Sequence, residues 1–177
     1  GENQNITLTP RRDDKSGRWL VGIVLKQDFD LPFDVTYNLD GVGGPSAGLM
    51  LTLGTIDKLT EQSLLAPEGA GNEDSARSYI AGTGTIDASG KVGAIGGIKY
   101  KIIASGRHGA HYFLAPRENC DDLQEIRRTD PNVFKYYRGE TPAGDMQVIP
   151  VDNVDEAVDA LTKIKNGAAP EQFPTCG

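Results

Sequence analysis

The chain has 177 residues and a formal net charge of −7, with 38% hydrophobic and 24% charged residues. This length and polarity predict one compact domain with a real core and argue against disorder. The acidic balance and the lack of a dense Lys/Arg run exclude nucleic acid as an expected partner, and no apolar run approaches the roughly 20 residues that span a bilayer.

The N-terminal part predicts a linker followed by strands. Residues 1–17 are polar, with a charged turn after Pro10, and are typical of a linker or of the end of a preceding domain. Residues 19–25 form an apolar run that predicts a buried strand, and residues 35–39 alternate as a second strand does.

A loop of small residues then leads into a helix. The sequence GVGGPSAG at positions 41–48 is followed by a helical pattern with Leu49, Leu53 and Ile56 on one face. A serine in the first turn of a helix exposes its hydroxyl beside unpaired backbone N–H groups that can hold an oxyanion. Ser46 is therefore a candidate nucleophile.

Strands and helices alternate through the rest of the chain. The predicted elements are a loop at 65–76, a strand at 79–86, a turn at 87–90 leading to its hairpin partner at 91–95, a helix at 98–107 ended by Gly109, a strand at 111–114, a helix at 121–128, a strand at 147–151, and a helix capped by Asn153 that ends at 166–167. This order predicts an α/β or α+β fold with a mixed sheet.

The two cysteines, Cys120 and Cys176, lie far apart in the sequence. They are either unrelated thiols or a disulfide that ties the terminal tail to the body, which requires an oxidising compartment. With two scattered histidines as the only other soft ligands, the pattern predicts no metal site.

The base that would activate Ser46 has two kinds of candidate. GPSAG at 44–48 matches the G-x-S-x-G nucleophile elbow, in which His108 or His111 would be the base of an esterase. That fold needs a large parallel sheet, and a lone short motif of this kind is a weak signal.

Lysine is the other candidate base. A lysine can act as a base near neutral pH only if its pKa falls from ~10.4 by about 3, a shift that costs about 4 kcal/mol. Burial away from water and away from carboxylates lowers the pKa in this way. The helix at 98–107 offers Lys99 and Lys101, both of which could equally be solvated surface residues. Helical geometry leaves the choice open, with a slight preference for Lys101 on a face of low relief.

Three motifs in order resemble the Lon (S16) protease domain, a Ser-Lys endopeptidase with its own proteolytic-domain fold. They are GPSAG at 44–48, GTG at 82–84 and VGAIGGIKYK at 92–101. The likeness continues through Gly109, the FLAP and EN sequences at 113–116 and 118–119, and the final strand and helix, so that it covers residues 18–166.

The resemblance implies a role for each matching position. It makes Ser46 the nucleophile, Lys101 rather than Lys99 the base, and Thr83 a residue that helps to orient the lysine ammonium. The oxyanion donors would be backbone N–H groups around Ser46, including those of Gly43 or Gly44.

Two departures from the family pattern bear on energy use. Gly43 and Gly44 stand where energy-dependent Lon enzymes usually carry an acidic residue, and the segment before Thr83 is longer. Both features resemble bacterial Lon-like proteases that have a membrane-anchored PDZ domain and no ATPase module. The sequence contains no G-x-x-x-x-G-K-[ST] motif, so it predicts no ATP binding of that kind.

The resemblance therefore implies a tail of a PDZ-like domain or linker at 1–17, a protease domain at 18–167 and a C-terminal tail at 168–177. It implies an extracytoplasmic location, which agrees with a Cys120–Cys176 disulfide. The expected function is an ATP-independent serine endopeptidase that needs no cofactor, acts on protein or peptide substrates and assembles into a homo-oligomeric ring. The alternatives are a binding or assembly module with little activity in isolation, and the esterase.

Overall fold

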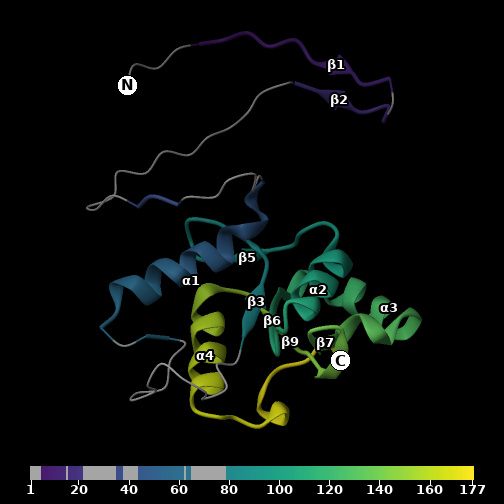
Figure 1. Ribbon diagram of the computed structural model, residues 1–177. Helices are drawn as coiled ribbons and strands as arrows, with labels where there is room; N and C mark the ends of the chain where they lie inside the picture. Colours follow the sequence, from purple (N-terminus) through teal and green to yellow (C-terminus); the bar gives the residue numbers. More distant parts are fainter. Residues whose placement is uncertain (1–4, 15, 22–34, 38–43, 62, 65–78) are drawn as a thin grey trace. The chain divides into compact units, whose positions relative to one another are not determined.

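The computed structural model describes residues 5–14, 16–21, 35–37, 44–61, 63–64 and 79–177 (Figure 1). The chain divides into two units, residues 1–37 and residues 38–177. What is described of the first unit is a short antiparallel ribbon in which β1 (Arg11–Arg12) pairs with β2 (Trp19–Leu20).

The predictions for the first unit are largely wrong where they can be followed. Trp19 and Leu20 do form a strand, but their side chains are 70% and 52% exposed, so the strand is not buried there. Residues 22–25 lie outside the described residues. Residues 35–37 have no regular secondary structure, and the rest of that predicted strand is outside the described residues. An apolar run predicts burial only if a partner surface covers it, and the two-stranded ribbon offers none.

A three-stranded parallel sheet forms the centre of the second unit. It has the order β3 (Ile80–Gly82), β6 (Tyr112–Pro116) and β9 (Gln147–Val151). Two antiparallel pairs lie outside it: β4 (Thr85–Ile86) with β5 (Val92–Gly93), and β7 (Lys135–Arg138) with β8 (Thr141–Asp145). The helices are α1 (Gly48–Leu59), α2 (Ile98–Arg107), α3 (Cys120–Thr129) and α4 (Val154–Lys165).

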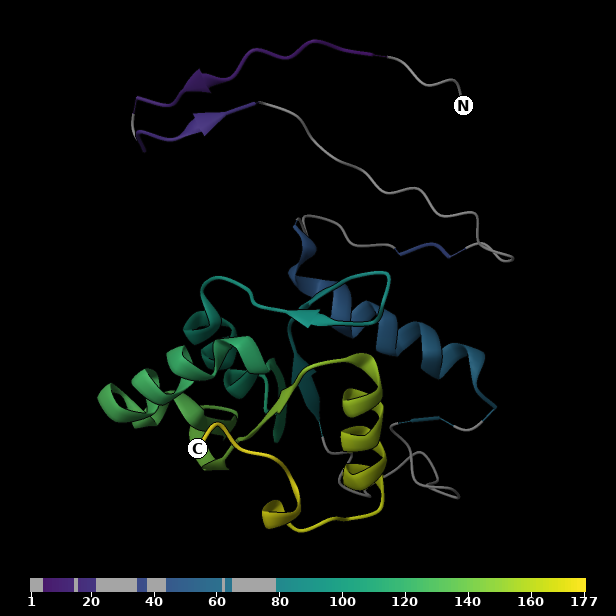
Figure 2. The ribbon, with the colours of Figure 1, turned by 180° about the vertical axis from the view of Figure 1, so that it is seen from behind.

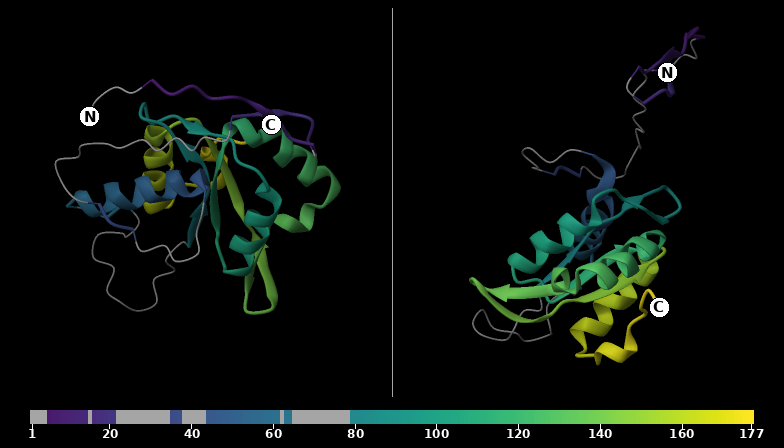
Figure 3. Two further views of the ribbon diagram at one scale, coloured as in Figure 1. Left: turned by 90° about the horizontal axis from the view of Figure 1, so that it is seen from above. Right: turned by 90° about the vertical axis from the view of Figure 1, so that its right-hand side faces the viewer.

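The sheet is covered by helices on both faces. Side chains alternate along a strand, so Leu114 of β6 packs with α1 and α4 in one core cluster, whereas Phe113 and Ala115 pack with α2 and α3 in another. The left view in Figure 3, seen from above, shows these layers, and Figure 1 shows α1 and α4 on one side of the sheet and α2 and α3 on the other. The result is a three-layer α/β unit, as the alternation of elements predicts.

Most element predictions in the described part of the second unit are confirmed; the loop predicted at 65–76 lies outside the described residues. The helices at 98–107 and after Asn153 occur as expected, and Asn153 Oδ1 accepts a hydrogen bond from the Glu156 amide at 2.9 Å. The Asp87 carboxylate organises the predicted turn by accepting from the amides of Ser89 and Lys91. The hairpin β7–β8 has no counterpart among the predicted elements, because its strands carry a weak alternation of apolar and polar residues.

The predicted strand at 79–86 is interrupted in the structure. It is divided into β3 and β4 by Thr83 and Gly84. Gly84 lies so close to its neighbours that a Cβ atom there would be 2.8 Å from Val92 Cγ1 and 3.3 Å from Leu49 Cβ. The chain thus leaves the sheet at the point where it passes α1, and only glycine allows that approach.

The C-terminal tail folds back onto the unit. Beyond α4 it forms a short 3-10 turn (Pro170–Gln172), buries Phe173 in the core and pairs Cys176 with Cys120 in a disulfide with an S–S distance of 2.09 Å. Figure 2 shows the tail returning from the end of α4 to the α3 side. Within the described residues, no helix has the length and apolar character that crossing a membrane requires.

We expect this disulfide to contribute to stability, because it closes a loop between residues 56 positions apart. A double variant, Cys120→Ser with Cys176→Ser, should lower the free energy of unfolding by about 2–4 kcal/mol, measured by urea denaturation followed by circular dichroism. The unsubstituted protein in reducing buffer should match the variant. If reductant left its unfolding midpoint unchanged, the prediction would be wrong.

Candidate functional site

Ser46 lies in a 3-10 turn, Pro45–Ala47, that runs directly into α1. The turn is preceded by Gly44 with φ +86°, a backbone conformation that other L-residues rarely adopt. Pro45 has no N–H group and its fixed φ suits a first helical position, so the Ser46 amide is the first donor of the turn. Gly43, the other predicted oxyanion residue, lies outside the described residues.

The carbonyl group of Ser46 accepts hydrogen bonds from the two residues between β3 and β4. Thr83 Oγ1 and the Gly84 amide both donate to Ser46 O, each at 2.9 Å, and the Leu49 amide donates back to Gly84 O at 3.1 Å. Thr83 is only 1% exposed, so its hydroxyl has little access to water. These three bonds fix the serine turn to the carboxyl end of β3.

The structure thus shows a contact for Thr83 that the sequence did not predict. The resemblance makes Thr83 a partner of the lysine ammonium, a role that stays a prediction, whereas its hydroxyl here donates to the serine carbonyl. The sequence analysis also gave Gly84 no role. A glycine within a strand pattern is the signal that could have indicated this close approach.

Lys101 reaches Ser46 from the other side of the sheet. It lies on α2, and its Nζ donates to Ser46 Oγ at 3.1 Å although the two residues are 55 positions apart. The side chain is half-buried. Lys99, the other lysine that periodicity left open, pairs instead with Asp130 of the loop after α3 at 3.1 Å. The structure therefore distinguishes Lys101 from Lys99, which helical spacing alone could not do.

The structure brings neither histidine to Ser46. His108 is the exposed C-cap of α2, and His111 packs against Tyr136 with ring centroids 4.4 Å apart and the rings tilted by 55°. The His111 amide bonds to Tyr79 O, at the start of the parallel strands, whereas Thr83 lies four residues further along, about 13 Å at the usual rise of a strand. Burial and the charge of Arg138 lower the pKa of His111. Among the described residues no hydrogen bond links a histidine to Ser46, so the geometry gives the esterase no support.

The chemistry of this arrangement follows from its three parts. An amine within hydrogen-bond distance of a hydroxyl can accept its proton when the amine is neutral. The first-turn amides after Gly44 point along a helix axis whose dipole favours negative charge. The position beyond the carboxyl ends of parallel strands is where ligands bind in open α/β sheets.

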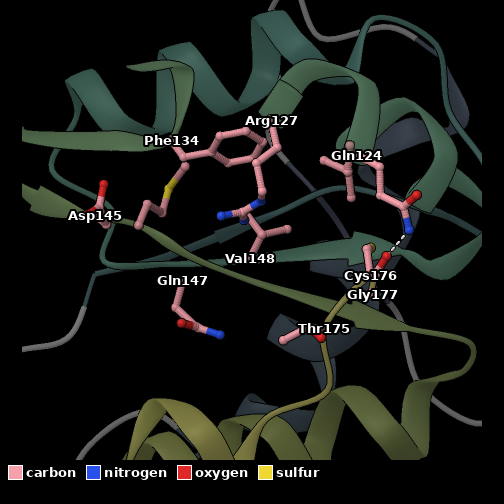
Figure 4. A pocket seen from close by; sticks show the side chains of 11 residues that line it. Gln124, Arg127, Phe134, Asp145, Gln147, Val148, Thr175, Cys176 and Gly177 are labelled. Atoms are coloured by element: carbon pink, nitrogen blue, oxygen red, sulfur yellow. Dashed lines mark hydrogen bonds between the residues drawn. The ribbon is translucent and has the colours of Figure 1, made fainter. Parts of the chain in front are cut away.

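A cavity of about 280 Å³ lies beside Cys176 of the disulfide (Figure 4). Figure 4 shows Arg127, Gln147 and Thr175 around it, and its lining includes neither Ser46 nor Lys101. In the part of the chain that the structure describes, no group of three or more His, Cys, Asp or Glu residues could hold a metal ion.

A serine turn and a lysine helix that meet at one edge of an α/β sheet define a candidate serine hydrolase. The sequence profile of the Lon protease (S16) C-terminal proteolytic domain matches residues 41–163, which is more than half of the chain. The chain belongs to this family.

Individual Lon proteases agree with the profile. The chain is 31% identical over 138 residues to the Lon protease of Rickettsia bellii, covering 77% of this chain and 15% of the relative. It is 31% identical over 157 residues to the Lon protease of Vibrio parahaemolyticus, covering 86% and 16%, and 34% identical over 121 residues to that of Haemophilus influenzae, covering 68% and 13%. The chain thus spans between 13% and 16% of the length of these relatives.

We expect the Thr83 hydroxyl to hold the serine turn in place. Thr83→Val keeps the shape of the side chain but removes its donor to Ser46 O, so it should cost about 1 kcal/mol of stability. It should also slow the labelling of Ser46 by a serine-reactive phosphonate several-fold, measured by mass spectrometry. Thr83→Ser retains the hydroxyl and serves as the control. Equal labelling rates in the valine and serine variants would contradict the prediction.

Proposed function

We propose that this chain is the catalytic domain of an ATP-independent serine endopeptidase in which Ser46 and Lys101 form a catalytic dyad. The observation that carries the proposal is the 3.1 Å hydrogen bond from Lys101 Nζ to Ser46 Oγ, in a chain of the Lon proteolytic-domain family. Its substrates would be proteins or peptides, as expected of a protease domain.

The mechanism follows from this geometry. Neutral Lys101 accepts the proton of Ser46 Oγ as the oxygen attacks the scissile carbonyl carbon. Backbone amides of the serine turn, with Ser46 and the loop at Gly44 as the candidates, stabilise the oxyanion of the tetrahedral intermediate. Lys101 then donates that proton to the leaving amine, and water hydrolyses the acyl-enzyme with Lys101 again acting as the base.

Independence from ATP is supported by a departure from the family pattern. Glycines precede the GPS sequence where energy-dependent relatives usually carry an acidic residue, and the segment before Thr83 is longer. We also propose assembly into a homo-oligomeric ring, on the resemblance to Lon-like proteases, with an active site that depends on that assembly.

The parent protein would be extracytoplasmic, with an N-terminal PDZ domain and a membrane anchor. The Cys120–Cys176 disulfide supports the location, because such bonds persist in oxidising compartments. The PDZ domain and the anchor rest on the resemblance to bacterial Lon-like proteases alone.

The dyad predicts a sharp difference between two neighbouring lysines. In assays without nucleotide, Ser46→Ala and Lys101→Ala should each lower kcat/KM for a fluorogenic peptide by at least about 1,000-fold, the scale on which loss of a nucleophile or its base acts. Lys99→Ala is the matched control and should stay within about twofold, because its half-exposed ion pair contributes little.

Phosphonate labelling of Ser46 at several protein concentrations separates the remaining functions. Labelling that rises with concentration supports a protease that needs its ring, and no labelling at any concentration would favour the binding module. Near-normal turnover in Lys101→Ala would refute the dyad. A loss of ester hydrolysis on replacing His108 or His111 would favour the esterase. Activity that requires added ATP would refute ATP independence.

The location predicts the redox state of the cysteines in the cell. If cells that make the native protein are quenched with acid and a thiol-alkylating reagent, Cys120 and Cys176 should resist alkylation until a reductant is added. Mass spectrometry of the peptides measures the modified fraction. Alkylation of both cysteines before reduction would indicate a reducing compartment and overturn the proposed location.

A further inference from the structure

The segment that leads into α2 is bound on one side by two adjacent side chains. Asn119 Oδ1 accepts from the Ile95 amide at 3.0 Å, and Asn119 Nδ2 donates to Ile95 O, also at 3.0 Å. Glu118 Oε2 accepts from the neighbouring Ala94 amide at 3.1 Å. Residues 94–95 are thus hydrogen-bonded to side chains much as a strand is to its neighbour.

Asn119 is placed for this role by its own surroundings. It is 3% exposed, and its Nδ2 also donates to Asp122 Oδ2 at 2.9 Å. A buried amide held by a carboxylate on one side keeps one orientation, so it presents a fixed donor and acceptor to Ile95. Glu118 is more exposed and also pairs with Lys91; the hydrogen bond from Lys91, the bond from the Ala94 amide and the charge of Lys91 lower the pKa of the Glu118 carboxyl. Asn119 is therefore the stronger of the two anchors.

This anchor is close in sequence to Lys101. Only six positions separate Ile95 from Lys101, and α2 begins between them at Ile98. Ile98 and Ile102 pack α2 on the sheet, but apolar contacts are not directional and tolerate sliding and rotation of a helix. A slip of one residue would turn Lys101 by about 100° around the helix axis, away from Ser46.

We propose that Asn119 is a positioning residue that sets the start of α2 and thereby holds Lys101 Nζ against Ser46 Oγ. The inference rests on the proposed Ser-Lys function. It means that each member of the dyad has an anchor of its own: Thr83 and Gly84 hold the serine turn, and Asn119 holds the approach to the lysine helix.

The test compares two asparagines with different neighbours. Asn119→Ala removes the bonds to Ile95, whereas Asn153→Ala removes the N-cap of α4 and serves as a control for general destabilisation. In the intact protein, Asn119→Ala should lower kcat for a peptide substrate 10- to 100-fold and leave KM within about twofold, because small displacements of a reacting group affect turnover strongly. Asn153→Ala should keep kcat within about twofold.

Hydrogen exchange supplies a readout that does not need activity. Peptides covering residues 94–101 should exchange at least tenfold faster in Asn119→Ala than in Asn153→Ala. Unchanged exchange there would overturn the anchor. If Asn119→Ala exchanged faster there but kept the kcat of Asn153→Ala, the positioning role of Asn119 would be overturned. If Ser46 were not labelled in the unsubstituted protein, the proposed function would fail, while the exchange data would still decide whether Asn119 holds this segment.

Discussion

The carbonyl oxygen of Ser46 is the acceptor on which the site depends. It receives two hydrogen bonds from adjacent residues of one interrupted strand, the hydroxyl of Thr83 and the amide of Gly84. In a regular strand the side chain stands out of the sheet while the following amide lies in its plane, so the interruption is what brings both donors to one oxygen. These bonds fix the serine turn and the start of α1 to the end of β3. The side-chain hydroxyl of Ser46 takes no part in them and accepts from Lys101 instead.

The sheet supplies the second constraint, since it separates the two helices that meet at its edge. Alternate residues of β6 contact opposite faces, which places α1 against one core cluster and α2 against the other. Ser46 and Lys101 then come together only beyond the carboxyl end of β3, where no strand stands between them. Apolar burial sets the separation of the layers, and directional hydrogen bonds at the ends of the elements set the finer geometry.

Local patterns predicted much of the second unit. The helix after Asn153 and the turn at Asp87 are encoded within a few residues, by a cap and by a carboxylate that accepts from nearby amides. Ser46 was recognisable because the small-residue loop and the helix start are contiguous. Choosing Lys101 over Lys99 needed either the family resemblance or the fold, since it depends on a contact across 55 positions. The exposure of Trp19 and the strand break at Gly84 depend on neighbours that periodicity does not contain.

The assembly of the proposed dyad from two layers has a consequence for the chain before it is folded. In a nascent or partly unfolded molecule whose helices have packed on only one face of the sheet, Ser46 and Lys101 are not in contact with each other. Such a molecule would be chemically inert toward its neighbours in a crowded compartment. If Ser46 and Lys101 are the proposed dyad, the ability to attack a peptide bond would be the last property that the chain acquires as it folds.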